Sequence, residues 1–234
     1  MERGERYERG LRPLSRRTPL WGDGGIRKGK KRMLRGRRVG GVKREGRNKA
    51  MLKPHDVPEC IVEAMLRHDI TDEDKYLYGC GRAIAFIRMA AEALDELGNE
   101  QKVAEYHGYA GISAARTSID AATNWLNIAL GIKQKQSSAL DIAKDGFYKN
   151  IVDRRPSIIL YVDCLRSLAK EIDRQRQRAQ HREGLGLWYY SSGDWHLAEP
   201  NVPKNQYRRI DSLLREWADT IEEQICRMIQ VLSL

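Results

Sequence analysis

After residue 57, apolar residues recur every three or four positions, which is the spacing of amphipathic helices. Three long segments share this spacing, and a proline opens or precedes two of them. Their apolar faces are Ile112, Ala115, Ile119, Ala122, Leu126 and Ala129 between about Glu100 and Leu130; Ile158, Val162, Leu165, Ala169 and Ile172 after Pro156; and Tyr207, Ile210, Leu214, Trp217, Ile221, Ile225 and Met228 after Pro203. Faces of this kind predict an all-α helical bundle.

A fourth long helix is predicted to begin at Thr71, because Asp74 three residues later completes a capping box. It should end near Leu97, before a glycine and an asparagine. Two shorter helical segments are predicted over residues 58–67 and 138–148. The apolar face of the helix after Thr71 comprises Leu77, Ala83 or Ile84, Ile87, Ala91 and Leu94.

A small β-hairpin is predicted before the last helix, after Gly184 and Gly186 stop the preceding one. Residues 187–190 and 195–197 are aromatic-rich and flank a four-residue turn that contains glycine. Because an isolated hairpin is only marginally stable, its aromatic side chains should fold onto the helices. Gly108 and Gly111 lie within the helical pattern between about Glu100 and Leu130. They either kink this helix or allow another helix to pack closely against it.

The charge of the chain is distributed unevenly. Residues 1–53 hold 19 Lys/Arg against 5 Asp/Glu, whereas the remaining residues hold 23 against 27. We therefore divide the chain into a basic Gly/Arg-rich arm, residues 1–54, and a helical body, residues 55–234. The arm has too few apolar residues to fold and should be disordered. Three interpretations of the arm are possible. It binds nucleic acid without sequence specificity, or it is a charged tail with no such role. Alternatively, translation starts at Met33 or Met51, and all or most of the arm is not part of the protein.

No segment has the length and apolar content of a membrane span, and the first residues are charged, unlike a secretory signal. The four cysteines are far apart and form no CxxC pair, which favours reduced thiols over a disulfide framework or a zinc site. We therefore expect a cytoplasmic protein that does not contact membranes. Nucleotide-binding and hydrolase fingerprints are absent, so no cofactor or metal is expected.

The segment from Glu171 to His181 combines arginines with a histidine at the end of an amphipathic pattern. Histidine exchanges a proton near neutral pH, and arginine presents a charged planar fork to phosphate oxygens. On a continuous helix, Arg174 and Arg178 lie on nearly the same face as His181, whereas Arg176 lies closer to the apolar stripe. The alternative interpretation is a solvated basic helix end, which suits the negative end of a helix dipole.

The run Arg176-Gln-Arg-Ala-Gln-His181 resembles the R-x4-6-H motif of HEPN domains, and Arg174 to His181 fits the longer spacing. HEPN domains are helical bundles that often dimerise. Many are metal-independent endoribonucleases, and others are inactive RNA-binding or scaffold modules, frequently in toxin–antitoxin or phage-defence systems. The resemblance implies that His181 handles a proton, that Arg176 or Arg174 stabilises the charged transition state, and that RNA, a homodimer partner or an antitoxin is bound.

Other residues could bind a metal or RNA, but each also has a purely structural interpretation. Asp194 and His196 offer two metal ligands, but no third is spaced nearby, so a surface turn is favoured. The aromatic residues Trp188, Tyr189, Tyr190 and Trp195 could stack on RNA bases or pack against the bundle. Three functional hypotheses remain: an RNA-acting HEPN-like domain, a non-catalytic helical interaction module, and a nucleic-acid-binding arm on an oligomerisation scaffold.

Overall fold

The computed structural model describes residues 57–67, 71–135, 140–181, 185–199 and 201–232. The predicted disordered arm, residues 1–54, lies outside them. The described part contains six α-helices and a small antiparallel sheet. The helices are α1 (Glu59–Met65), α2 (Asp72–Asp95), α3 (Gln101–Ala129), α4 (Asp145–Arg154), α5 (Ile159–His181) and α6 (Ile210–Leu232).

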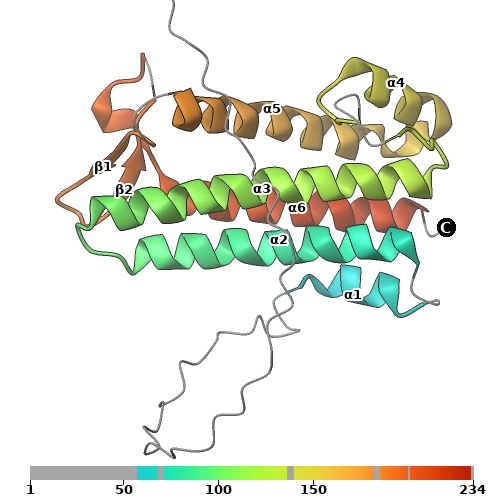
Figure 1. Cartoon of the computed structure of the whole chain (residues 1–234), viewed down its shortest axis with the longest axis horizontal. Coiled ribbons are helices and arrows are strands. Elements are labelled where there is room, and N and C mark those ends of the chain that lie inside the picture. Colours follow the sequence, from blue (N-terminus) through green and yellow to red (C-terminus); the bar gives the residue numbers. More distant parts are fainter. Residues whose placement is uncertain (1–56, 68–70, 136–139, 182–184, 200, 233–234) are drawn as a thin grey trace, which may run out of the picture. The chain divides into compact units, whose positions relative to one another are not determined.

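Four long helices, α2, α3, α5 and α6, lie side by side and alternate in direction around one hydrophobic core (Figure 1). The sheet caps one end of this bundle, and α1 packs against α2 and α6. The predicted all-α bundle with a small β element is thereby confirmed. Among the described helices, none combines the length and apolar content that a bilayer crossing requires.

The predicted capping box starts α2. The Thr71 amide donates a 2.7 Å hydrogen bond to the Asp74 carboxylate, and the Thr71 hydroxyl accepts from the Asp74 amide at 3.3 Å. These bonds satisfy donors that the first helical turn would otherwise leave open. One residue earlier, Glu73 accepts a 2.9 Å hydrogen bond from the indole of Trp125 on α3. The start of α2 is therefore fixed both locally and by its neighbour.

Gly108 and Gly111 allow close helix packing, and α3 runs through both without a break. A Cβ atom at Gly111 would lie 2.5 Å from Leu214 Cδ1, and one at Gly108 would lie 2.9 Å from Ile210 Cδ1. Both contacts are with α6, so the missing side chains let α3 and α6 approach. Of the two alternatives for these glycines, the structure shows close packing.

The predicted helix over residues 138–148 was misplaced. The described helix α4 begins at Asp145 and ends at Arg154, and residues 138 and 139 lie outside the described residues. Asp141 accepts a hydrogen bond from the Ala143 amide, which holds this stretch in a turn before α4. Local side-chain bonding of this kind competes with helix formation. A 3₁₀ turn at residues 156–158 then leads into α5.

The predicted hairpin is part of a three-stranded antiparallel sheet. Strand β1 (Leu187–Tyr189) pairs with β2 (Trp195–Leu197), and β2 pairs with β3 (Arg208–Arg209). Gly193 adopts φ +92° in the turn, a conformation that favours glycine. Tyr207, expected on the last helix, instead precedes β3, and α6 begins only at Ile210. The residues predicted to form the first turn of the last helix therefore include strand β3, which pairs with β2.

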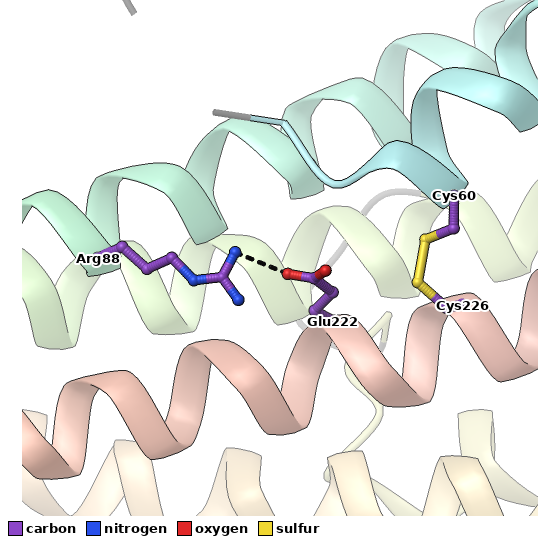
Figure 2. The surroundings of a disulfide bond; sticks show 4 residues. All are labelled: Cys60, Arg88, Glu222 and Cys226. Atoms are coloured by element: carbon purple, nitrogen blue, oxygen red, sulfur yellow. Dashed lines mark ion pairs between the residues drawn. A yellow bond between two sulfur atoms is a disulfide. The ribbon is translucent and has the colours of Figure 1, made fainter. Parts of the chain in front are cut away.

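The expectation of four reduced cysteines is wrong for two of them. Cys60 on α1 and Cys226 on α6 form a disulfide with a Cα–Cα distance of 5.7 Å (Figure 2). Cys80 and Cys164 remain free thiols, the first buried and the second half-buried. Along α6, Glu222 pairs with Arg88 of α2 at 2.7 Å. Covalent and ionic contacts therefore both attach α6 to the helices beside it.

Candidate functional site at the end of α5

Helix α5 continues without interruption to His181. Its last two turns consist largely of Gln, Arg and Ala, which are good helix formers. The backbone of His181 is described as the end of the helix, whereas its side chain lies outside the described residues. Because the helix is unbroken, helical geometry can be used to compare the positions of the three arginines with that of His181.

Helical geometry separates the arginines by face. Positions 174 and 181 are seven residues apart, so they project within about 20° of each other around the axis. Positions 176 and 181 are separated by about 140° on the same reckoning. Position 176 instead lies on the side of the buried Ile172. On α5 itself, Arg174 is the better-placed partner for His181, and Arg176 is not.

Arg178 links α5 to the sheet through hydrogen bonds. One of its guanidinium nitrogens, Nη2, donates a 2.8 Å hydrogen bond to the carbonyl oxygen of Ala198, directly after β2. Another, Nη1, donates to the side chain of Gln175 at 3.0 Å, and Gln175 is buried. Arg208 of β3 adds a 3.3 Å contact with Glu171 of α5. The end of α5 is therefore joined to the sheet by two arginines.

Arg176 lies beside a cluster of aspartates around a buried arginine. Arg116 of α3 is 7% exposed, and its guanidinium lies 3.0 to 3.2 Å from the carboxylates of Asp120, Asp141 and Asp173. Arg176 approaches Asp173 at 3.8 Å from the outer side. Three carboxylates thus meet two guanidinium groups, so a phosphate that approached Arg176 would also meet the excess negative charge.

Partial burial raises the pKa of the Asp120 carboxyl, against the opposing effect of Arg116. This cluster was not predicted from the sequence. Its signal was Arg116 itself, a charged residue that directly follows Ala115 in the apolar seam of α3. Because its members come from α3, α5 and the stretch before α4, the cluster serves to orient these three segments.

Arg174 differs from its neighbours in the basic run. It is exposed, and within the described part of the chain its guanidinium forms no hydrogen bond or ion pair. No described residue therefore occupies its five N–H donors, which an anionic ligand could bind. Of the three arginines in the run, Arg174 alone combines exposure with the face of position 181.

The aromatic residues of the sheet divide into two groups. Trp195 is buried, and its indole donates a 3.0 Å hydrogen bond to the carbonyl of Gly98. Trp188 and Tyr189 are more than 40% exposed, and the ammonium of Lys204 lies 3.7 Å from the centre of the Trp188 ring. The packing interpretation holds for Trp195, and the Tyr189 ring packs against it with the ring centres 5.0 Å apart. Trp188 and Tyr189 nevertheless keep part of their ring surface exposed, at the same end of the bundle as the end of α5 (Figure 1).

Asp194 and His196 are engaged with the protein. Asp194 pairs with Arg209 at 3.1 Å, and the Nδ1 nitrogen of His196 donates to the Tyr207 carbonyl at 2.8 Å. Across the described residues, no group of three or more His, Cys, Asp or Glu side chains is arranged to hold a metal ion. These two residues join the strands of the sheet.

No family model, curated protein or solved structure matches this chain. A functional assignment therefore depends on the chemistry of the chain's own residues. The end of α5 and the adjoining sheet offer an exposed arginine with no partner among the described residues, a histidine position on the same helical face, and partly exposed aromatic rings.

Proposed function

We propose that this protein is a HEPN-like helical domain that acts on RNA as a metal-independent endoribonuclease, with Arg174 and His181 as the reacting pair. One observation carries the proposal: α5 is continuous to His181, and the exposed Arg174 shares the helical face of that position. We therefore favour Arg174 over Arg176, the first choice from the family motif. The proposed system is toxin–antitoxin or phage defence, with a homodimer or an antitoxin as partner.

The proposed reaction divides between the two side chains. His181 accepts the proton of a ribose 2′-hydroxyl, whose oxygen attacks the adjacent phosphorus, and solvent protonates the departing 5′-oxygen. Arg174 stabilises the charge that builds on the phosphoryl oxygens in the transition state. The two positions are about 10 Å apart along the helix axis, so a nucleotide is expected to lie between them instead of a direct Arg–His hydrogen bond.

Binding of single-stranded RNA is proposed to use the sheet. Trp188 and Tyr189 are partly exposed, and unpaired bases can stack on the ring surface that they leave open. Lys204 lies over one face of Trp188 and supplies a positive charge there. The basic arm is proposed to add affinity that does not depend on base sequence. The proposed compartment is the cytoplasm. The Cys60–Cys226 bond argues against that compartment, because cytoplasmic systems keep most thiols reduced, and the redox state of these two cysteines in cells tests the assignment.

The second candidate is a non-catalytic interaction module. The observation in its favour is that two of the three arginines in the run already have structural partners: Arg178 holds the sheet, and Arg176 adjoins Asp173. In this alternative, Arg174 and His181 form only the solvated end of a helix. The two candidates differ in whether RNA is cleaved.

Cleavage of a labelled single-stranded RNA in EDTA tests the proposal. His181→Ala should lower the rate about 10²–10⁴-fold, and Arg174→Ala about 10²–10³-fold, as expected for a proton-transfer group and a transition-state donor. Arg176→Ala should have little effect. Arg227→Ala, an exposed arginine on α6, serves as the matched control. A substrate with 2′-deoxyribose at the cleaved position should not react.

Full activity of His181→Ala would refute the catalytic role, and cleavage lost in Arg176→Ala but kept in Arg174→Ala would return the assignment to the family pattern. Deletion of residues 1–50 separates the arm from the motif. If the motif acts, the shortened chain still cleaves. If only the arm binds, RNA retention disappears and no cleavage is seen with either chain. Retention by the arm should also weaken steeply with salt.

A further inference from the structure

A cavity of about 640 Å³ opens at the end of the bundle opposite the sheet. It lies between the beginning of α2 and the ends of α1, α3, α4 and α6. Its volume is within the range of about 300–1,000 Å³ that is typical of small-molecule sites. Because the proposed RNA site is at the end of α5 beside the sheet, this cavity is a separate feature.

The floor of the cavity is apolar. It includes Leu77 of α2, Trp125 of α3 and Ile229 of α6, all of which are nearly inaccessible to solvent. The only polar atom of Trp125 is satisfied, because its indole N–H donates to Glu73. The lining also includes the half-buried Ala129, Leu130 and Leu232, which still expose hydrocarbon to water, and an apolar group placed against them would remove that surface from water.

Three arginines line the cavity and are exposed: Arg67, Arg154 and Arg155. Arg154 donates to the carbonyl of Leu130 at 3.1 Å, and Arg155 donates to the carbonyl of Val231 at 3.4 Å. These bonds use one nitrogen of each guanidinium and leave most of its donors open. In the part of the chain that the structure describes, none of the three arginines forms an ion pair.

Two carboxylates that also line the cavity limit the charge that it can accept. Glu73 and Asp74 line it from the first turn of α2. Three guanidinium groups against two carboxylates leave one positive charge to be matched. A monoanion suits this balance, whereas a dianion would add negative charge near both acids.

We propose that this cavity binds a small organic monoanion, with a carboxylate held by Arg154 and Arg155 and an aromatic or branched aliphatic body on the apolar floor. A carboxylate accepts paired N–H bonds from a guanidinium, which fixes the head at the rim. The body then lies against Ala129, Leu130 and Leu232. This site is distinct from the proposed RNA chemistry and does not depend on it.

The test uses the full-length, non-reduced protein and three probes measured by titration calorimetry: 2-naphthoate, the neutral 2-naphthamide, and 2-naphthyl phosphate. We expect saturable binding of 2-naphthoate, with the amide and the phosphate each at least about tenfold weaker. The three probes share one aromatic body, so the differences report the head group alone.

Variants locate the binding. Arg154→Gln and Arg155→Gln should each weaken 2-naphthoate binding about tenfold, and Ala129→Phe, which places a large side chain on a lining position, should abolish it. Arg82→Gln, at an exposed arginine of α2 outside the cavity, should leave affinity unchanged. Thermal unfolding of each variant confirms that it is folded.

Four results would overturn the proposal. The first is the absence of 2-naphthoate binding to the folded wild-type protein. The second is binding that survives all three cavity variants, which would place the anion on the basic arm or elsewhere. The third is tighter binding of the phosphate than of the carboxylate. A lower unfolding temperature in Arg154→Gln or Arg155→Gln with unchanged affinity would show that these arginines only cap the ends of α3 and α6.

Discussion

Arg116 of α3 and Asp173 of α5 form an ion pair of 3.2 Å between two helices that are separated in sequence by 29 residues. The arginine is buried, and Asp120 and Asp141 complete its surroundings. A buried guanidinium is tolerated only where partners replace its water, and here three carboxylates do so. The pair orients α5, and with it the face that carries Arg174.

Replacement of Arg116 by Met should destabilise the protein strongly, because three carboxylates would remain without their cation. We expect a loss of about 3–5 kcal/mol in the free energy of unfolding, measured by urea denaturation at neutral pH. The difference in unfolding free energy between the variant and the wild type should become smaller as pH falls, because protonation of the three carboxylates removes the charges that repel one another. Arg227→Met, at an exposed position, should change stability by less than about 0.5 kcal/mol. An equal effect of both substitutions would contradict the assigned role.

Gly111→Ala should destabilise the bundle despite the higher helix propensity of alanine. Its Cβ would lie 2.5 Å from the buried Leu214, so α3 and α6 would have to move apart, at a cost of about 1–3 kcal/mol. Gly146→Ala in α4 is the matched control, because a Cβ there meets nothing within 4 Å. That variant should gain up to about 1 kcal/mol. Equal shifts in the unfolding midpoints would argue against the close helix contact.

The capping box of α2 predicts that different substitutions of Thr71 lower the stability of the protein by different amounts. Thr71→Ala removes the hydroxyl that bonds to Asp74 and should cost about 0.5–2 kcal/mol in thermal or urea unfolding. Thr71→Ser keeps the hydroxyl and should retain most of the stability. If Ser and Ala variants are equally unstable, the methyl group and not the cap is responsible.

Thiol labelling should distinguish all four cysteines. Burial raises the pKa of Cys80 to about 12, so at pH 8 almost none of it is thiolate, the reactive form. Iodoacetamide should therefore modify Cys164 slowly and Cys80 only after unfolding, with both rates rising as pH increases. Cys60 and Cys226 should react only after a reductant is added. Mass spectrometry of native and denatured samples checks the order, and rapid native labelling of Cys80 would refute its burial.

Features encoded by near neighbours were predicted well from the sequence. The apolar stripes of α2, α3, α5 and α6 follow from a three-to-four spacing, and the cap at Thr71 needs only residues three positions apart. The start of α6 was set instead by pairing of Arg208 and Arg209 with β2, which the local pattern does not contain. The same limit applies to α4, where Asp141 forms a turn beside Arg116.

The candidate site was predicted in part for the same reason. The basic run and its histidine are contiguous, and helix periodicity already favoured Arg174 or Arg178 over Arg176. Only the folded chain shows that Arg178 bonds to Ala198 and that Arg176 meets Asp173. The cavity lined by Arg154 and Arg155 has no contiguous signal, because its walls come from five helices.

The bond between Cys60 and Cys226 joins residues 166 positions apart, so nearly the whole helical body forms a closed covalent ring. A protease that cuts one loop within this ring opens it without releasing a fragment. Nicked molecules would keep their mass apart from one added water and would separate into pieces only when reduced. The ring thus keeps the two sides of a single backbone break covalently joined, which the same bundle without this bond would not do.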